Sequence, residues 1–317
     1  MKRLSAAIVV ALSLTACQRP GDEFREGLPK EDMVKLNVPA NSSNALTDGT
    51  GQSQHELKGD TAGLYVLTRG ATVIVNGGAV AVLGLVKAIT NHPPTSLKEN
   101  SAVWGPHTEA LSPTTWKLTV TRTAARDFTY ALEGKAKTAA DSAYVVVLSG
   151  SHKAGSVRDT GTGTFLLDWD RLQTLPEHDD NVGTAQFDYS RDPSGAVTVT
   201  THFTQVKDGA STHRIDADYR YASQSHGGTF EFSTQKDMGG GTAKERLTIK
   251  SRWKPTGAGR SDVKASGGDF STAATVSECW DTSFKSQYLN VSYEASQNYG
   301  TEATDCAFVG AEFSTLQ

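Results

Sequence analysis

The chain has 317 residues, enough for one large domain or two ordinary ones. It carries 31 Lys and Arg residues against 35 Asp and Glu, a formal net charge of −4. This mildly acidic balance argues against nucleic acid as a partner, because no basic stripe is present to neutralise phosphates.

The first 16 residues have the pattern of an export signal. Lys2 and Arg3 precede an apolar run from Leu4 to Leu14, and small residues follow. The run is too short to cross a bilayer as a helix. We therefore predict that residues 1–16 are a signal peptide. Its removal takes Lys2 and Arg3 away and leaves 29 basic against 35 acidic residues, a net charge of −6.

The end of this run, Leu14-Thr15-Ala16-Cys17, resembles the lipobox of bacterial lipoproteins. The resemblance implies that Cys17 is acylated and becomes the first residue, so that two or three acyl chains hold the protein to a membrane. Gln18 follows, and in the enteric sorting scheme a residue other than Asp there implies the outer membrane. The periplasmic and surface faces of that membrane both stay open. The alternative is an ordinary secretory signal with a coincidental cysteine.

Residues 17–60 are rich in Pro, Gly, Asn, Ser and charge, which predicts a flexible tether. Within it, residues 28–39 include apolar side chains that can dock on the body. Residues 61–92 form an apolar segment predicted to be helical and to stop before Pro93. We expect Asn76-Gly77-Gly78 to interrupt this segment. The uncharged run from Ala71 to Val86 is short for a membrane span, which favours a buried core helix over membrane insertion.

Residues 93–270 alternate between apolar and polar side chains, the period of β-strands. Trp116, Leu118 and Val120, for example, alternate with Lys117 and Thr119. Turn sequences separate the runs: Asp192-Pro193-Ser194-Gly195, Lys207-Asp208-Gly209, His226-Gly227-Gly228 and Gly239-Gly240-Gly241. The pattern predicts a long antiparallel meander with one apolar and one charged face.

Such a sheet must bury its apolar face, either by curling around an interior or by wrapping the helical segment. We expect a mainly β fold, a strongly curved sheet or half-barrel with the helical segment packed on its apolar face. This architecture resembles the half-barrel carriers of lipids and lipoproteins. The body is also similar to outer-membrane lipoproteins without an assigned activity, through Val75-Asn76-Gly77-Gly78, Pro93-Pro94-Thr95 and Trp104-Gly105-Pro106-His107.

An integral outer-membrane barrel would show the same period with its apolar side chains outside. The chain ends Ser314-Thr315-Leu316-Gln317, without the terminal aromatic that such barrels usually carry, and a lipid anchor would be redundant. We expect residues 271–317 to be a loop-rich segment of the same domain. Its Cys279 and Cys306 predict a disulfide in an exported protein. A two-cysteine metal site is the alternative, but no His lies beside either cysteine.

No sequence pattern predicts a catalytic, metal or cofactor site. Strand parity places His202 on the polar face and His213 on the apolar face, so they should not share an ion. The loop with His178, Asp179 and Asp180 lacks the glycine turn and closing Glu of an EF-hand. In Gly150-Ser151-His152 the hydroxyl and the imidazole should face opposite sides of a strand.

We therefore expect a lipid-anchored envelope protein that is not an enzyme and binds a lipid or other apolar ligand in its curved sheet. One alternative is a scaffold or assembly protein that recruits another envelope protein through its charged face or loops. Another is a secreted hydrolase without a recognisable motif.

Overall fold

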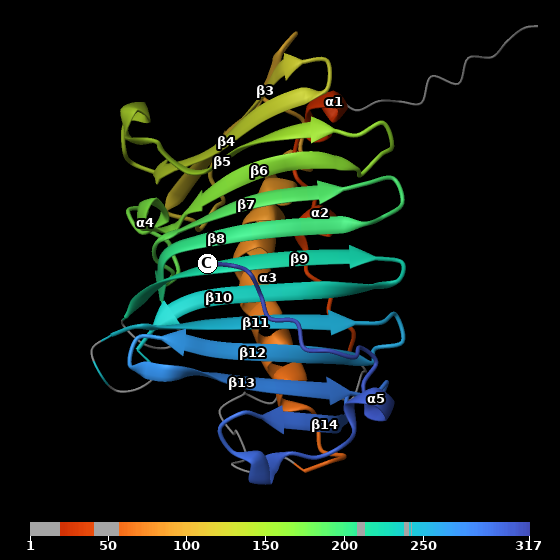
Figure 1. Ribbon diagram of the computed structural model, residues 1–317. Coiled ribbons are helices and arrows are strands. Elements are labelled where there is room, and N and C mark those ends of the chain that lie inside the picture. The colour runs from red at the N-terminus through yellow and green to blue at the C-terminus, as the bar shows by residue number, and fades with distance from the viewer. Residues whose placement is uncertain (1–19, 41–56, 208–212, 238–240, 242) are drawn as a thin grey trace, which may run out of the picture.

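The protein, seen here as a computed structural model, is described for residues 20–40, 57–207, 213–237, 241 and 243–317. The predicted sheet is present as a single sheet of 14 strands (Figure 1). The helices are α1 (Asp22–Arg25), α2 (Glu31–Val34), α3 (Gly63–Thr90), α4 (Trp169–Leu172) and α5 (Glu302–Asp305), with 3-10 turns at Asp141–Ala143 and Ala295–Gln297. The strands are β1 (Ser96–Lys98), β2 (Ser101–His107), β3 (Thr114–Ala124), β4 (Asp127–Ala136), β5 (Val145–Ala154), β6 (Gly161–Asp168), β7 (Thr184–Arg191), β8 (Val197–Lys207), β9 (Arg214–Gln224), β10 (Gly227–Lys236), β11 (Glu245–Trp253), β12 (Gly259–Gly267), β13 (Phe270–Trp280) and β14 (Ser286–Val291).

The strands follow one another in chain order, each antiparallel to the next, so the predicted meander is confirmed. The sheet stays open, with β1 and β14 at its two edges. Alternation along each strand separates an apolar face from a polar face. On the apolar face, aromatic side chains of neighbouring strands pack together: the rings of Phe165 and Phe187 stack with centroids 4.5 Å apart, and those of Tyr219 and Phe232 meet at a tilt with centroids 4.9 Å apart. This apolar face carries the main core.

Helix α3 lies across the strands on the apolar face (Figure 1). Its buried side chains, including Val75, Leu83 and Val86, join the core. The helix has 28 residues and is therefore about 42 Å long. Ten strand spacings of about 4.8 Å, from β2 to β12, make about 48 Å. The helix is thus nearly long enough to extend from β2 to β12, and it packs on the apolar face as predicted from the sequence.

The expected break at Asn76-Gly77-Gly78 is absent, because α3 continues through it. The side chain of Asn76 bonds both backbone groups of Leu36: its amide donates to the carbonyl at 2.9 Å, and its oxygen accepts from the N–H at 2.8 Å. These bonds fix the helix to the chain after α2. A Cβ added at Gly77 would meet no atom within 4 Å. The glycine therefore lies on the open side of a helix whose other side is held by packing.

The docking expected for residues 28–39 is present, whereas the prediction of a flexible tether was wrong for residues 20–27, which also pack on the body. Phe24 is fully buried and meets Phe128 edge to face, with ring centroids 6.3 Å apart. Met33 and Val34 of α2 are buried in the same core. Leu28 and Leu36 of the same stretch are buried in this core as well. Residues 17–19 and 41–56, the rest of the expected tether before Leu57, lie outside the described part.

The predicted boundary at residue 270 was also wrong, because the sheet continues through β13 and β14 to Val291. Only the chain from Ser292 onward is loop-rich. The predicted disulfide between Cys279 and Cys306 is present and ties this segment to β13. On the apolar face near the same end, Tyr65 of α3 stacks on Phe284 in a small second core with Trp280.

Candidate binding face

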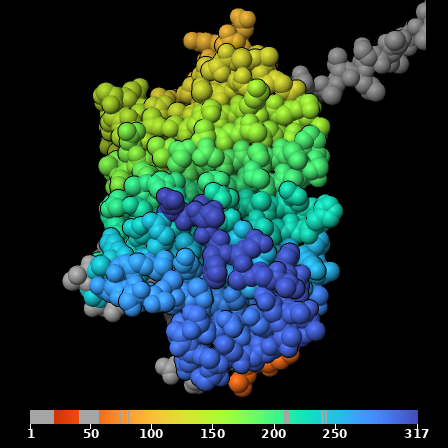
Figure 2. Space-filling model, viewed as in Figure 1, coloured from red at the N-terminus to blue at the C-terminus, as the bar shows by residue number. Residues whose placement is uncertain are grey.

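The two faces of the sheet differ in what covers them. Helices α1, α2 and α3 cover the apolar face, whereas the C-terminal residues cross the polar face (Figure 1). Figure 2 shows this crossing segment in dark blue over the later strands, while the surface of the earlier strands, in green, is bare. The polar face is therefore divided into a covered part over β10–β12 and an open part over β3–β8.

Charged side chains fill the covered part. Arg260 and Asp262 of β12 are almost completely buried and are joined by a bond of 2.8 Å from Nε to Oδ1. The backbone N–H of Glu312 donates to Asp262 at 3.1 Å, and Lys250 pairs with the Glu312 carboxylate at 3.0 Å. Arg260 also pairs with Glu302, and hydrogen bonding to this guanidinium holds the pKa of Glu302 below its usual value. The charged side chains of the covered part are therefore paired with one another and with the C-terminal segment.

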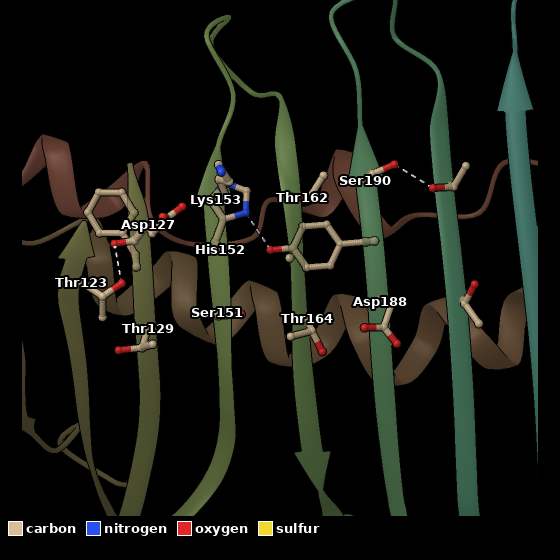
Figure 3. A pocket seen from close by; sticks show the side chains of 15 residues that line it. Thr123, Asp127, Thr129, Ser151, His152, Lys153, Thr162, Thr164, Asp188 and Ser190 are labelled. Atoms are coloured by element: carbon tan, nitrogen blue, oxygen red, sulfur yellow. Dashed lines mark hydrogen bonds between the residues drawn. The ribbon is translucent and has the colours of Figure 1, made fainter. Parts of the chain in front are cut away.

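The open part of the polar face contains a hollow of about 490 Å³ (Figure 3). This volume is in the range of small-molecule sites. Most of its lining side chains carry a hydroxyl group: Thr123, Thr129, Ser151, Thr162, Thr164, Ser190, Thr198 and Thr200. Three charged side chains, Asp127, Lys153 and Asp188, also line it. The hollow is consequently a polar surface rather than an apolar pocket.

Strand register arranges these side chains in two rows that run across the strands. The first row has Thr129, Ser151, Thr164, Asp188 and Thr200 as successive partners on β4 to β8. The second row, formed by the same register, has Asp127, Lys153, Thr162, Ser190 and Thr198. Neighbouring strands lie about 4.8 Å apart, so each row presents a polar group at that interval. A hydroxyl both donates and accepts hydrogen bonds, so each row can pair with an extended, hydroxyl-bearing ligand.

Two buried side chains, His152 of β5 and Tyr189 of β7, also border the hollow and are bonded to each other (Figure 3). His152 is 2% exposed, and its Nδ1 lies 2.9 Å from the Tyr189 hydroxyl. Burial, with a smaller contribution from the charge of Lys30, lowers the pKa of His152 to about 4. Burial likewise raises the pKa of Tyr189. Both groups are therefore neutral near pH 7 and form a buried border of the hollow.

The structure separates the other residues that the sequence singled out. Both Ser151 and His152 border the hollow, but Ser151 is half-buried and His152 is buried, which agrees with the opposite sides that strand parity predicted. His202 is exposed and bonds Asp218 at 2.6 Å. The placement of His213 on the apolar face was wrong, because it precedes β9 and is exposed. That placement relied on parity with Ile215, and strand parity does not extend to a residue before the start of β9.

The acidic loop after β6 uses its carboxylates in local structure. Asp168 caps α4 by accepting from the N–H of Arg171 at 2.9 Å, and Asp170 accepts from the N–H of Gly183 at 2.9 Å. Asp179 accepts from the N–H of Asn181 at 3.0 Å. Among the residues that the structure describes, no group of three or more His, Cys, Asp or Glu side chains is placed to hold a metal ion.

Single sequence motifs do not reveal the hydroxyl rows. Their signal is present in the sequence as Thr or Ser at alternate positions of adjacent runs, such as Thr162 and Thr164, then Thr198 and Thr200. Only the register shows that these positions align across strands. Cys17, the predicted lipidation site, lies outside the described residues. Comparisons with family models, curated proteins and solved structures found no match to this chain.

Proposed function

We propose that the protein is a lipid-anchored envelope protein, held through acylated Cys17, that binds a hydroxyl-rich polysaccharide on the open part of its polar face and does not act as an enzyme. The observation that supports this most directly is the pair of hydroxyl rows aligned over β4–β8 in an uncovered hollow. A row of groups that each donate and accept matches a chain of sugar hydroxyls. Carboxylates such as Asp188 add strong acceptors for the same ligand.

The expected apolar ligand would have to share a face with the helices. Val75, Leu83 and Val86 of α3 already occupy the apolar side of the sheet. A lipid of any size would have to displace α3, whose Thr68 and Asn76 are hydrogen-bonded to the body. We therefore locate binding on the opposite face. The apolar-ligand prediction remains open to native mass spectrometry of the purified body.

Binding without catalysis is the simpler use of this hollow. Its carboxylates belong to Asp127 and Asp188, and Asp127 is the direct cross-strand partner of Lys153. The one imidazole that borders the hollow, that of His152, is 2% exposed and bonded to the Tyr189 hydroxyl, so it is poorly placed to activate a hydroxyl of the two rows. These features favour a binding surface over a hydrolase site.

The test is binding of the purified lipoprotein to two polysaccharides, peptidoglycan sacculi and the polysaccharide released from lipopolysaccharide. We expect binding to one of them and at least a tenfold loss in the double variant Thr164→Val and Asp188→Asn. Thr272→Val, an exposed threonine on β13 outside the hollow, is the matched control and should bind as the parent does. Absence of binding to both polymers would overturn the proposal. Detection of a bound lipid by native mass spectrometry would favour the apolar ligand instead.

A further inference from the structure

The outer side of α3, facing away from the sheet, is an apolar surface. Leu67 is 39% exposed and Val73 is 48% exposed. Gly70, Gly77 and Gly84 follow at intervals of seven residues, which places them on one side of the helix. A Cβ at any of these three would meet nothing within 4 Å. The described residues therefore leave this side of the helix without a cover.

The charge pattern of α3 suits a lipid surface. The helix contains no acidic residue, and its only charged residues are Arg69 near one end and Lys87 near the other. Between these two the helix is uncharged, and by length and composition the whole of α3 would be able to cross a membrane. It cannot cross one in this fold, because its inner side is packed on the sheet through Val75 and Val86. With that side held by the protein, the exposed side of α3 can meet a bilayer only by lying in the plane of the interface.

The start of the described chain indicates which side of the molecule is near the membrane anchor. Residue 20 leads into α1, and the Nε of Arg25 donates to the carbonyl of Thr90, the last residue of α3, at 2.7 Å. The chain therefore enters on the helix-covered face (Figure 1). Cys17 is three residues earlier, and three residues reach at most about 10 Å. This step rests on the proposed acylation of Cys17, whose acyl chains would then enter the bilayer close to the C-terminal end of α3.

We propose that the outer side of α3 lies flat on the phospholipid bilayer that holds the Cys17 acyl chains. Leu67 and Val73 enter the interface, while Arg69 and Lys87 meet lipid headgroups. The sheet stands between this helix and the hydroxyl rows, so the docked molecule presents its polar face away from the membrane. The short link at the N-terminus and the helix thus act together to set the orientation of the protein.

The test compares two labelled positions on the full acylated chain. Val73→Cys and Leu166→Cys each replace an exposed apolar residue, on α3 and on the opposite face at β6, respectively. The native cysteines do not compete for label, since Cys279 and Cys306 are bonded and Cys17 is acylated in the proposed form. Each variant carries an environment-sensitive fluorophore and is reconstituted in vesicles of phosphatidylethanolamine and phosphatidylglycerol.

We expect iodide in the aqueous phase to quench the Val73→Cys label at least fivefold less than the Leu166→Cys label. A lipid-borne doxyl quencher should quench only the Val73→Cys label. Equal quenching by iodide would overturn the inference. Protection from both quenchers would also overturn it, because it would show that protein, such as the α3 of a second copy, covers the helix. Circular dichroism checks that both variants fold.

Mass spectrometry of the same samples separates this inference from the proposed function. If Cys17 carries no acyl group, the lipid anchor itself is wrong. If the acyl groups are present and the Val73→Cys label is still open to iodide, the anchor stands and only the docking of α3 is wrong.

Discussion

At the scale of single residues, the most unusual group is the buried imidazole of His152. It lies among core side chains at the border of the hollow, bonded to Tyr189 and near the charge of Lys30. Lys30 of the α2 segment forms an ion pair with Asp159 in the turn between β5 and β6. A protonated His152 would have to carry its charge in an apolar setting beside another cation. This position therefore couples the packing of the core to pH.

The stability of the fold should depend on pH through His152. Its pKa is about 4 in the folded protein and 6.5 in an unfolded reference chain. Between these values the unfolded chain binds a proton that the folded chain does not, so stability falls as the pH drops from 6.5 to about 4. The loss is about 3 kcal/mol. Urea unfolding across this range should show the loss in the parent and not in His152→Asn. His226→Asn, at an exposed turn, should retain it; a parent protein equally stable at both ends would contradict the prediction.

Asp262 is the second residue on which the fold depends. Its carboxylate is fully buried and accepts from the Arg260 guanidinium, the Ser277 hydroxyl at 2.7 Å and the backbone N–H of Glu312. A buried ion pair adds little net stability, but removing one partner leaves the other charge uncompensated. Asp262 thus holds β12 and the C-terminal segment together.

Replacing Asp262 by Ala should lower the free energy of unfolding by about 3–5 kcal/mol, because the buried Arg260 would keep only the partly exposed Glu302 as a charged partner. Glu312→Gln is the matched control. The Glu312 side chain is 52% exposed, so this change should cost about 1 kcal/mol or less. Chemical denaturation of both variants measures the difference. Similar small losses in the two would show that Asp262 is not the centre of the network.

At the scale of elements, the inner side of α3 packs on the sheet, and its outer side is not covered by the described residues. Glu278 of β13 supports its start, since the carboxylate accepts from the N–H of Leu64 at 2.6 Å. Negative charge at a helix N-terminus is favourable. Gly70, Gly77 and Gly84 of α3 face open space, so their effect is mainly on the backbone.

Gly77→Ala should stabilise the protein by about 0.5–1 kcal/mol, because alanine has the higher helix propensity and a Cβ there meets nothing within 4 Å. Gly150→Ala is the contrasting change on β5. A Cβ at Gly150 would lie 2.2 Å from the carbonyl oxygen of Thr164, so this variant should be destabilised. Thermal unfolding of the two should move in opposite directions. A destabilised Gly77→Ala would show that the outer side of α3 is covered by protein.

At the scale of the whole molecule, the disulfide decides whether the covered part of the polar face stays covered. Cys279 and Cys306 are separated by 27 residues. Closing a loop of this length stabilises a fold by about 3–4 kcal/mol in the chain-entropy model. The C-terminal segment beyond Cys306 carries Glu312 and Ser314, which bond to the sheet.

The double variant Cys279→Ser and Cys306→Ser should lose about 3–4 kcal/mol of stability. Its C-terminal segment should also exchange backbone hydrogens faster than in the parent, because the remaining contacts are polar. Hydrogen exchange measured by mass spectrometry gives both readings. The strands β4–β8 serve as the internal reference, and faster exchange there instead would show that the disulfide acts on the sheet rather than on the segment.

Much of this architecture was readable from local patterns. Alternation along runs such as Trp116 to Val120 depends on neighbours in sequence, so the strands and the meander were predicted correctly. The predicted interruption of the helix at Gly77 was wrong. A glycine in an otherwise apolar segment is typical of a helix end, and only the packing of the helix shows that it continues. The docking of Phe24 was missed because a stretch with few apolar residues reads as loop. The hydroxyl rows were missed because register is a relation between strands.

The sequence alone determined the strand order, the separation of apolar and polar sides and the disulfide pair, since each follows from period, short turns or the number of cysteines. The tertiary structure decided that residues 20–40 belong to the core, that α3 runs unbroken across the sheet, and which polar side chains share a surface. The physical reason is the distance along the chain over which each kind of interaction acts. Alternation and turn chemistry act within a few residues, whereas the partners of Asn76, His152 and Asp262 come from distant segments that only folding brings together.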